Sequence, residues 1–506
     1  MVIKYPINGI LSTTSQSSQA QRIRKYVYFL IIFTVIILYI FTDELSSIFT
    51  DIIPCNKANS GICLKFNDIK DKKNIENINE TITEIDTPIL IKPEPLPVDP
   101  LDSERFLTYV PHSGLHNQRI AFENAIFLAW SLNRTLILPP LLLGKRFGYT
   151  DYDLMLNRLL PLKSDKSNLE QDCLMEKINN PRKSIKNCID FHNSYMLTTW
   201  NQLFDLSFIE KHVKIIYNHR VNIPKLVHEQ LKIVDEEKDV YYDKLYAGYH
   251  AFFESSIPPQ KIGPIADGRI QKYYILNQFK NNPQKLLVFA SLFGPGTFIR
   301  QSEKSEDFFY VMQKSILPKN EIMLNVAKRI SDKMGGTFNY LSFHGRAGDG
   351  HYKVLADERI ANVISNIRKD MPDFNKINMN LYNNLTDSER HELCFKNIKL
   401  APSATKFSRF TRIYIASDVP KSSPPLQVIF QTFPCAYMMS DFEEELEPLN
   451  QVINTLDKQN MYKFIIPLVD LMVGSNANKL YTMGRSTFAS YMKRYHNHLV
   501  DESKKH

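Results

Sequence analysis

The sequence has little glycine and little cysteine, with 17 glycines and 6 cysteines among 506 residues. So few glycines exclude a collagen-like repeat, and so few cysteines over this length exclude a small disulfide-stabilised scaffold. Hydrophobic residues make up 43% and charged residues 23%, which excludes a wholly disordered or low-complexity protein. The chain has no internal repeat, and its length predicts two or three domains with a real core.

The net charge of +8 is not evenly distributed. Lys4, Arg22, Arg24 and Lys25 supply half of this excess within the first 25 residues, which contain no acid. The rest of the chain is therefore only weakly basic, and we expect no nucleic-acid partner.

An uncharged apolar run, YVYFLIIFTVIILYIF, covers residues 26–41. Basic residues precede it and Asp43 and Glu44 follow it, so the positive-inside rule predicts a cytosolic tail at 1–25 and a lumenal C-terminal part. We predict an uncleaved signal anchor at 26–42 with type II topology. A cleaved signal peptide is the alternative, but no small-residue cleavage site follows Phe41. Because the run is shorter than the ~20 residues of a typical span, we expect a Golgi or ER membrane.

All six cysteines follow the predicted anchor, so we expect them in an oxidising lumen. The simplest disulfide pattern joins neighbours in the sequence, and free buried cysteines are the alternative. The pairs would be Cys55 with Cys63, Cys173 with Cys188, and Cys394 with Cys435. No zinc-type spacing is present. Three sequons predict glycosylation at Asn79, Asn133 and Asn384.

Two series of strands and helices follow a stem. Residues 43–103 include the proline-rich TPILIKPEPLPVDP and have no sustained period, which is typical of an extended spacer. The β-type run at 106–110, a helix with Ala121, Ala125 and Leu128 on one face, and the strand TLIL predict a βαβ unit. A second series begins near residue 320. We expect an α/β fold with Rossmann-like domains at 104–320 and 321–500.

The second series starts at about 300–325 and contains helix and strand patterns in turn. A helix pattern from 321 stops at Gly335 and Gly336, and apolar runs at 340–344, 412–417, 436–440 and 479–483 predict strands. Residues 468–477 predict a further helix. The last strand is expected to turn at Gly484 into a helix that begins near Ser486.

Loops that follow strands are the candidate sites, because ligands of open α/β sheets bind at the carboxyl ends of the strands. The loop PHSGLHNQR at 111–119 places Asn117 at a helix start, where anions bind. Capping of that helix by Ser113 or Asn117 is the alternative. The loop GRSTF at 484–488 offers the Ser486 and Thr487 hydroxyls to a phosphate, with a simple N-cap as the alternative.

The loop HGRAGDG at 344–350 directly follows a predicted strand. His344 and Arg346 stand at a strand end, and the Arg346 guanidinium offers a fork for phosphate oxygens unless it forms a surface ion pair. Asp349 is expected to bind loop amides.

Two acidic features need separate interpretation. Asp470 is a lone acid in an apolar helical stretch and needs a cap, a salt bridge or the N–H groups of a ligand. The triplet Asp151-Tyr152-Asp153 matches a metal-binding Asp-x-Asp pattern, but no suitable strand precedes it. We therefore predict no metal site.

Four blocks together resemble the GDP-fucose protein O-fucosyltransferase family over about 104–497. They are YVPHSGLHNQRIAFENAIFLAWSLNRTLILPPLLLG, YLSFHGRAGDG, RIYIASDVP and VDLMVGSNANKLYTMGRSTFASYMKR. The resemblance implies a GT-B glycosyltransferase with two facing Rossmann-like domains. It also implies metal-independent, inverting transfer of fucose from GDP-fucose to a glycoprotein or glycan acceptor, without a cofactor.

The resemblance also implies roles for individual residues. Arg346 would be catalytic and contact the leaving β-phosphate, with His344 helping to hold the nucleotide. Asp470 would accept the guanine N–H groups. The other implied donor-binding residues are Ser486 and Thr487 at phosphate oxygens, Phe488 against the nucleotide and Asn117 from the facing domain, while Asp418 would have a structural role in its loop.

The chain departs from the family pattern in HGRAGDG, where Gly345 and Ala347 stand and a second basic residue is missing. No general base is obvious, because Glu123 lies about two turns into the first helix. Two other functions stay open at this point. One is a transferase that uses another GDP-sugar such as GDP-mannose, and the other is a catalytically silent lumenal binding module.

Overall fold

The computed structural model describes residues 104–148, 150–245, 250–254, 272–294, 298–374, 386–395, 407–484 and 486–505. Every described residue lies in one compact unit of the chain, Leu90–His506. The predicted tail, anchor and stem lie outside the described residues, as do Asn79, Asn384, Cys55 and Cys63. Among the helices that are described, none is long and apolar enough to cross a membrane.

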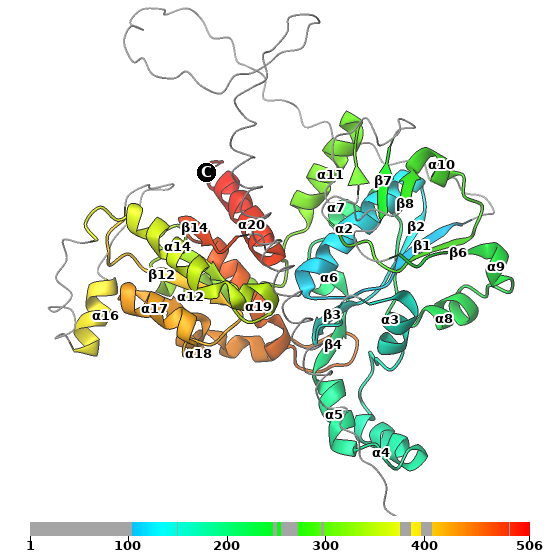
Figure 1. Cartoon of the computed structure of the whole chain (residues 1–506), viewed down its shortest axis with the longest axis horizontal. Coiled ribbons are helices and arrows are strands. Elements are labelled where there is room, and N and C mark those ends of the chain that lie inside the picture. The colour runs from blue at the N-terminus through cyan, green and yellow to red at the C-terminus, as the bar shows by residue number, and fades with distance from the viewer. Residues whose placement is uncertain are drawn as a thin grey trace, which may run out of the picture. The chain divides into compact units, whose positions relative to one another are not determined.

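Five parallel strands form the main sheet of the part that precedes residue 316, which we call the N-lobe (Figure 1). Their order is β5-β2-β1-β9-β6. The strands are β1 (Phe106–Tyr109), β2 (Thr135–Leu138), β5 (Ile215–Tyr217), β6 (Val240–Asp243) and β9 (Leu286–Phe289). Strands β1, β2 and β9 are buried at every residue, as expected of a parallel sheet that is covered on both faces.

Helix α2 (Leu115–Leu132) follows β1, and 14 of its 18 residues are buried. The sequence predicted one apolar face, but α2 packs against its own sheet on one side and against α10, α11 and α20 on others, so almost no face meets solvent. The remaining helices of the N-lobe are α3 (Tyr152–Leu159), α4 (Leu169–Asn179), α5 (Ile185–Asn193), α6 (Trp200–Leu203), α7 (Ser207–Glu210), α8 (Ile223–Lys225), α9 (Glu236–Asp239), α10 (Leu276–Lys280) and α11 (Glu303–Ser315).

Two smaller sheets flank the main one in the N-lobe. Strands β3 (Leu141–Gly144) and β4 (Tyr195–Thr198) pair antiparallel, and β7 (His250–Phe253), β8 (Lys272–Ile275) and β10 (Phe298–Ile299) form a parallel sheet in the order β10-β7-β8. Helices α4 and α5 lie between β3 and β4 in the sequence and pack against each other. They form an arm that projects from the lobe in Figure 1.

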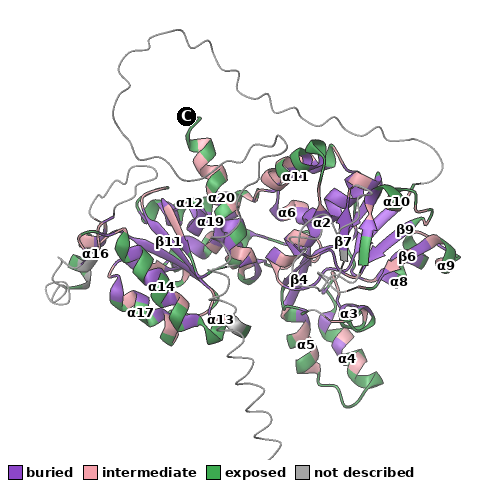
Figure 2. Cartoon of the chain, turned by 45° about the horizontal axis from the view of Figure 1, so that its top comes forward, coloured by how far each residue is buried: buried purple, intermediate pink, exposed green. Residues whose placement is uncertain are grey.

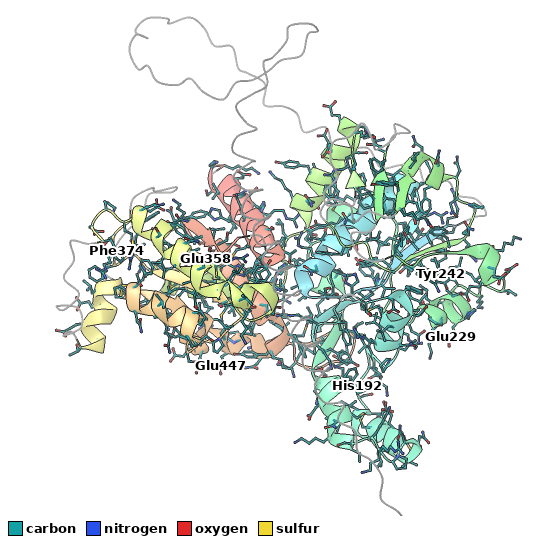
Figure 3. The ribbon with its side chains drawn as sticks, in the orientation of Figure 1. His192, Glu229, Tyr242, Glu358, Phe374 and Glu447 are labelled. Atoms are coloured by element: carbon teal, nitrogen blue, oxygen red, sulfur yellow. A yellow bond between two sulfur atoms is a disulfide. The ribbon has the colours of Figure 1, made fainter. Side chains whose placement is uncertain are left out.

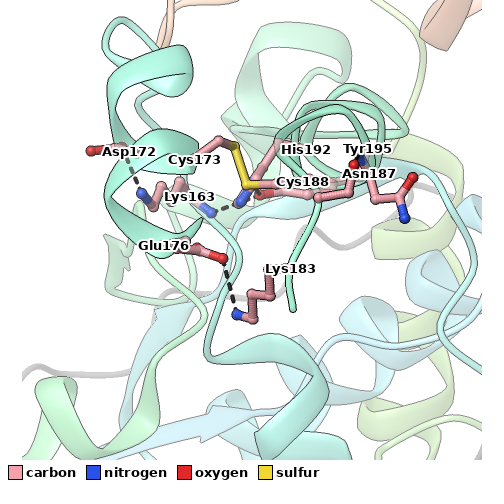
Figure 4. The surroundings of a disulfide bond; sticks show 10 residues. Lys163, Asp172, Cys173, Glu176, Lys183, Asn187, Cys188, His192 and Tyr195 are labelled. Carbon is pink, nitrogen blue, oxygen red and sulfur yellow. Dashed lines mark hydrogen bonds and ion pairs between the residues drawn. A yellow bond between two sulfur atoms is a disulfide. The ribbon is translucent and has the colours of Figure 1, made fainter. Parts of the chain in front are cut away.

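A disulfide between Cys173 and Cys188 joins the two helices of this arm, with the Cα atoms 5.7 Å apart (Figure 4). A second disulfide joins Cys394 to Cys435. Both pairings predicted from the sequence are thereby confirmed. Next to the first disulfide, His192 Nδ1 lies 2.7 Å from the Tyr195 hydroxyl, and Figure 3 shows His192 where the arm meets the rest of the lobe.

Removing the arm disulfide is expected to loosen the arm without unfolding the lobe. In a Cys173→Ser/Cys188→Ser variant the segment between α4 and α5 should be cleaved at least about tenfold faster by a limiting amount of protease, because the cross-link restrains local opening. The matched control is Cys394→Ser/Cys435→Ser, which should leave this cleavage rate unchanged. Equal cleavage of the arm in wild type and variant would contradict the expectation.

Four parallel strands form the sheet of the second part, from residue 321 onward, which we call the C-lobe. They are β11 (Leu341–Gly345), β12 (Ile413–Ser417), β13 (Ala436–Met438) and β14 (Lys479–Thr482), in the order β13-β12-β11-β14. The strand order reverses between β11 and β14, so the carboxyl ends of these two strands form the switch point where ligands of such sheets bind. The predicted α/β fold with parallel sheets is confirmed.

The helices of the C-lobe cover both faces of its sheet. They are α12 (Glu321–Lys333), α13 (Gly350–Val354), α14 (Ala356–Lys369), α16 (Asp387–Phe395), α17 (Pro424–Thr432), α18 (Glu443–Leu446), α19 (Tyr462–Ser475) and α20 (Thr487–Ser503). Helix α19 begins six residues before the predicted start and continues through Pro467, because Phe464 and Ile465 pack into the core and anchor its first turns.

Helix α20 connects the two lobes, since it packs against α19 of the C-lobe and α2 of the N-lobe. One continuous hydrophobic cluster includes Phe122 of α2, Leu468 of α19 and Tyr491 of α20. Figure 2 shows buried residues along the sheets and these helices in both lobes. The lobes therefore share a packed apolar contact, and the loops at their strand ends are held in defined positions.

Candidate functional site

His344 and Phe488 meet at the switch point of the C-lobe sheet. His344 is the fourth residue of β11, and Phe488 lies in the first turn of α20, which follows β14. Their rings stack with centroids 4.6 Å apart and an angle of 16°. Burial lowers the pKa of His344 to about 4, with a further contribution from the charge of Arg346, so the imidazole is neutral at physiological pH.

Behind this stack, His116 packs its ring edge-on against Phe488 at 5.0 Å. Burial and the positive charge of Arg119 lower its pKa well below the usual value, so this imidazole is neutral too. The neutral rings of His116, His344 and Phe488 thus form an aromatic wall that joins the helix start of the N-lobe to the strand end of the C-lobe.

Arg346 follows β11 directly and carries a half-buried side chain. Its Nε and Nη2 donate to the two carboxylate oxygens of Asp349 at 3.2 and 3.1 Å, and its guanidinium lies 4.5 Å from the ring centre of Tyr352. The ion pair that was the alternative interpretation of Arg346 is therefore formed. It leaves Arg346 Nη1 at the strand end, where the lobe would bind an anionic ligand.

Asp418, at the end of the neighbouring strand β12, organises the backbone of this loop. Its Oδ1 accepts hydrogen bonds from the Ala347 and Gly348 amides at 2.9 and 3.1 Å. The expectation that Asp349 binds loop amides was wrong, because its carboxylate instead pairs with arginine side chains. Amide binding falls to Asp418, as expected of a structural role in the loop.

Asn117 and Thr487 bring the two lobes into direct hydrogen-bonding contact. The Thr487 hydroxyl donates to Asn117 Oδ1 at 2.8 Å. Neither Asn117 nor Ser113 caps α2 with its side chain, since Gly114 holds the N-cap position and makes no side-chain bond. The capping alternative for this loop was therefore wrong. Ser113 instead adopts a left-handed φ of 68°, a strained conformation of the kind found at functional sites.

Ser486 caps α20, and its hydroxyl accepts a hydrogen bond of 3.5 Å from the Ala489 amide. Gly484, two residues earlier, has a φ of 106°, which a side chain at this sharp strand-to-helix turn would strain. The predicted turn and helix start are confirmed. Because the first amides of a helix lack partners within the helix, this N-terminus has donors to offer to a phosphate beside Arg346.

Asp470 lies on α19, and its Oδ1 accepts a hydrogen bond from the Tyr414 hydroxyl at 2.6 Å. Burial raises the pKa of Asp470 to about 7, although the Tyr414 bond acts in the opposite direction. No described lysine or arginine pairs with it. It also makes no direct contact with the His344, Arg346 and Phe488 group, so the structure places it on the same lobe but beside β12 rather than at the strand ends.

The Glu123 carboxylate forms ion pairs and a hydrogen bond inside the contact between the lobes. Its carboxylate pairs with Arg119 on the same helix and with Arg494 of α20, and Gln313 donates to Glu123 Oε2 at 2.8 Å. Although burial acts to raise the pKa of Glu123, the two guanidinium charges outweigh it and lower the pKa. This carboxylate stays charged, so it has a structural role and is a poor general base.

Replacing Glu123 by glutamine should therefore lower stability and spare catalysis. The neutral amide would leave the buried Arg119 and the partly exposed Arg494 without a counter-charge, and we expect a loss of about 3 kcal/mol in the free energy of unfolding. Denaturant titration measures this loss, and turnover per folded molecule should stay within about twofold of wild type. A large loss of turnover at unchanged stability would assign Glu123 to the chemistry instead.

One cluster of the metal-ligand type occurs among the described residues, formed by Cys173, Cys188 and His192. Its two sulfur atoms are joined in a disulfide, so they are not available as thiolates (Figure 4). In the Asp-x-Asp triplet, Asp151 caps α3 through the Leu154 amide, and Asp153 lies 3.4 Å from Lys244. The two aspartates therefore have separate structural partners.

Asn133 is exposed at the C-cap of α2 with a left-handed φ of 50°. The next two residues of its sequon, Arg134 and Thr135, are buried at the start of β2. Glycosylation at Asn133 stays a prediction.

Sequence reasoning identified the strand-end loops but missed the residues that hold them. Tyr414 was assigned only to a strand, and the aromatic wall residue His116 only to a polar loop. In hindsight, a lone acid such as Asp470 in an apolar helix signals that a hydroxyl or amide partner must exist, but nothing in the sequence points to Tyr414.

Two sequence comparisons with known proteins found matches. The sequence profile of the family described as GDP-fucose protein O-fucosyltransferase matches residues 106–499. A segment of 39 residues is 56% identical to O-fucosyltransferase 30 of Arabidopsis thaliana, and it covers 8% of this chain and 8% of that protein.

Two solved structures align with the chain at low similarity. One is POFUT1 in complex with GDP, at 13% identity and a TM-score of 0.35, covering 79% of this chain and 97% of that one. The other is the fucosyltransferase NodZ from Bradyrhizobium, at 14% identity and a TM-score of 0.34, covering 78% and 93%. Scores this low carry no information about individual residues.

Proposed function

Because the chain belongs to the GDP-fucose protein O-fucosyltransferase family, we propose that it transfers fucose from GDP-fucose to a glycoprotein or glycan acceptor. In this proposal the fold is of the GT-B type, and transfer is metal-independent with inversion at the fucose anomeric carbon. An acceptor hydroxyl oxygen forms the new bond to that carbon and its proton passes to solvent, while the bond to the β-phosphate oxygen breaks and GDP leaves with the bonding electrons.

One observation carries the proposal beyond family membership. The switch point of the C-lobe sheet collects Arg346, His344 and Phe488, and the Thr487–Asn117 hydrogen bond brings in the facing lobe. A guanidinium, the first backbone amides of a helix and an aromatic wall are groups that can bind the phosphates and the ring system of a nucleoside diphosphate.

Arg346 is assigned the main catalytic role. In a loose transition state the leaving diphosphate gains negative charge, and a guanidinium that is already in place lowers the barrier by stabilising it. Ser486 and Thr487 are proposed to bind the phosphate oxygens, Phe488 and His344 to pack against the nucleotide, and Asp470 to accept the guanine N–H groups.

The place of action is also a proposal. The apolar run at 26–42, with basic residues before it, supports a type II anchor in the Golgi or ER membrane with the described unit in the lumen. Two disulfides among the described residues are consistent with an oxidising compartment.

The test is calorimetric titration of the full-length chain, purified in detergent, with GDP-fucose, GDP-mannose, GDP and a UDP-sugar, each with and without a chelator. We expect tight, chelator-insensitive binding of GDP-fucose and GDP, and none of the UDP-sugar. Binding that disappears with the chelator would contradict metal independence. A folded chain that binds no guanine nucleotide would overturn the proposed function, and faster turnover of GDP-mannose than of GDP-fucose would change the donor.

A further inference from the structure

A second arginine reaches the anion-binding loop of the C-lobe from the N-lobe. Arg146 Nη1 lies 2.6 Å from Asp349 Oδ2, and Arg346 Nη2 lies 3.1 Å from the same oxygen. Two guanidinium groups from different lobes therefore flank one carboxylate oxygen.

The backbone on both sides of Arg146 is fixed. The Lys145 amide donates to the Ser194 carbonyl at 2.8 Å, and the Phe147 carbonyl accepts from the Ser113 amide at 2.7 Å. The second of these bonds ties the loop of Arg146 to the loop that carries Asn117. Arg146 thus stands on an ordered segment beside a proposed donor-binding residue.

Gly144, the last residue of β3, sets this segment against the C-lobe. Its φ is 80°, and a Cβ atom there would lie 2.5 Å from the Ser194 carbonyl and 2.6 Å from the ring of Phe464. Only glycine fits such a position. The close approach holds the chain just before Arg146 against α19, which places the arginine at the junction of the two lobes.

Two guanidinium groups, one from each lobe, face the Asp349 carboxylate. The Arg346 hydrogen bond together with both guanidinium charges keeps the pKa of Asp349 below its usual value. Among the described residues, Arg146 Nε and Nη2 and Arg346 Nη1 form no hydrogen bond. The Arg146 side chain is 56% exposed, so these donors are accessible to a ligand.

We propose that Arg146 binds the donor's diphosphate from the N-lobe, opposite Arg346, while Asp349 holds the two guanidinium groups side by side. This inference rests on the proposed function, because it concerns the same donor. Arg146 would supply the second basic contact that Ala347 does not provide in HGRAGDG, and it would do so from the facing lobe. The donor would then bind both lobes through its phosphates.

The experiment compares GDP with GMP by calorimetry on the full-length chain. We expect Arg146→Ala to weaken GDP binding about tenfold or more while GMP binding stays within about twofold, because the lost contact is to the β-phosphate. Arg146→Lys should fall between wild type and alanine, since it keeps the charge and loses the fork. Arg158→Ala is the matched control, because Arg158 is an exposed arginine on α3. This variant should bind both nucleotides as tightly as wild type does.

A second variant distinguishes direct binding of the phosphates by Arg146 from an indirect effect of the Arg146–Asp349 ion pair between the lobes. In an Asp349→Asn chain, Arg146→Ala should still weaken GDP binding at least about fivefold. The inference would be overturned if Arg146→Ala had no effect in the Asp349→Asn chain. It would also be overturned if Arg146→Ala alone weakened GMP binding as much as GDP binding, or left GDP affinity unchanged. Failure of the wild-type chain to bind GDP would instead overturn the proposed function, so the two failures are distinguishable.

Discussion

Arg346→Ala is expected to lower turnover of GDP-fucose at least ~10²-fold. The guanidinium stands at the carboxyl end of β11, next to the switch point, and its Asp349 pairing pre-orients it. The charge that it would stabilise develops on the leaving diphosphate, so removing it should lower kcat more than it weakens substrate binding. Release of GDP from GDP-fucose, in the presence of a mixture of lumenal glycoproteins as acceptors, measures the loss.

Stability is expected to change little in this variant, so the effect on turnover can be interpreted directly. Partly exposed ion pairs such as Arg346–Asp349 contribute about 1 kcal/mol or less to folding. Arg346→Lys should recover part of the rate, because it keeps the charge but not the two-pronged geometry. Near-full activity of Arg346→Ala, with a melting curve like that of wild type, would remove Arg346 from its catalytic role.

The strands of both lobes were predictable because their sequences carry local information. Runs such as TLIL and RIYIAS have short apolar centres and are followed by proline or aspartate, which is typical of buried parallel strands. The strand-end loops could be predicted from the same pattern, since the carboxyl ends of parallel strands lie at one edge of the sheet. His344 and Arg346 could be named for this reason, whereas the role of Phe488 came only from the family resemblance.

The contacts between the lobes were not predictable, because they join residues far apart in the chain. Glu123 and Arg494 are separated by 371 positions and Arg146 and Asp349 by 203, and no local pattern connects them. The arm at α4 and α5 was missed for another reason. Its helices are short and bury few residues, so they carry too few apolar positions to be identified from the sequence, and only the two cysteines indicated that the segment was ordered.

Nucleotide binding is expected to weaken as the pH falls through about 7, because Asp470 must be ionised to accept two guanine N–H donors. Its pKa is raised to about 7 by burial, so at pH 6 roughly nine-tenths of the free protein would carry a protonated Asp470 and the affinity should drop about tenfold from its value at pH 8. His344, with a pKa of about 4, does not titrate in this range. Guanosine is the better probe than GDP, because it has no phosphate that titrates near pH 6.

Asp470→Asn is expected to separate binding from stability. The asparagine amide would replace one acceptor by a donor, so guanosine and GDP affinity should fall ~10²-fold and lose their pH dependence between 6 and 8. The same substitution should raise the stability of the folded protein at high pH, although it weakens nucleotide binding. An acid with a raised folded-state pKa binds its proton more tightly when folded, so wild-type stability falls as the pH rises from about 4 to about 7, and the neutral variant should melt at a higher temperature at pH 8.

Tyr414→Phe provides the matched control for this assignment. The Tyr414 hydroxyl lowers the pKa of Asp470, so its removal should raise that pKa further and move the midpoint of guanosine binding to higher pH without abolishing binding above it. Calorimetry at pH 6, 7, 8 and 9 measures the midpoint in both variants. Guanosine affinity that is flat across this range in wild type, or an Asp470→Asn variant that binds as wild type does, would show that the base is recognised elsewhere on the C-lobe.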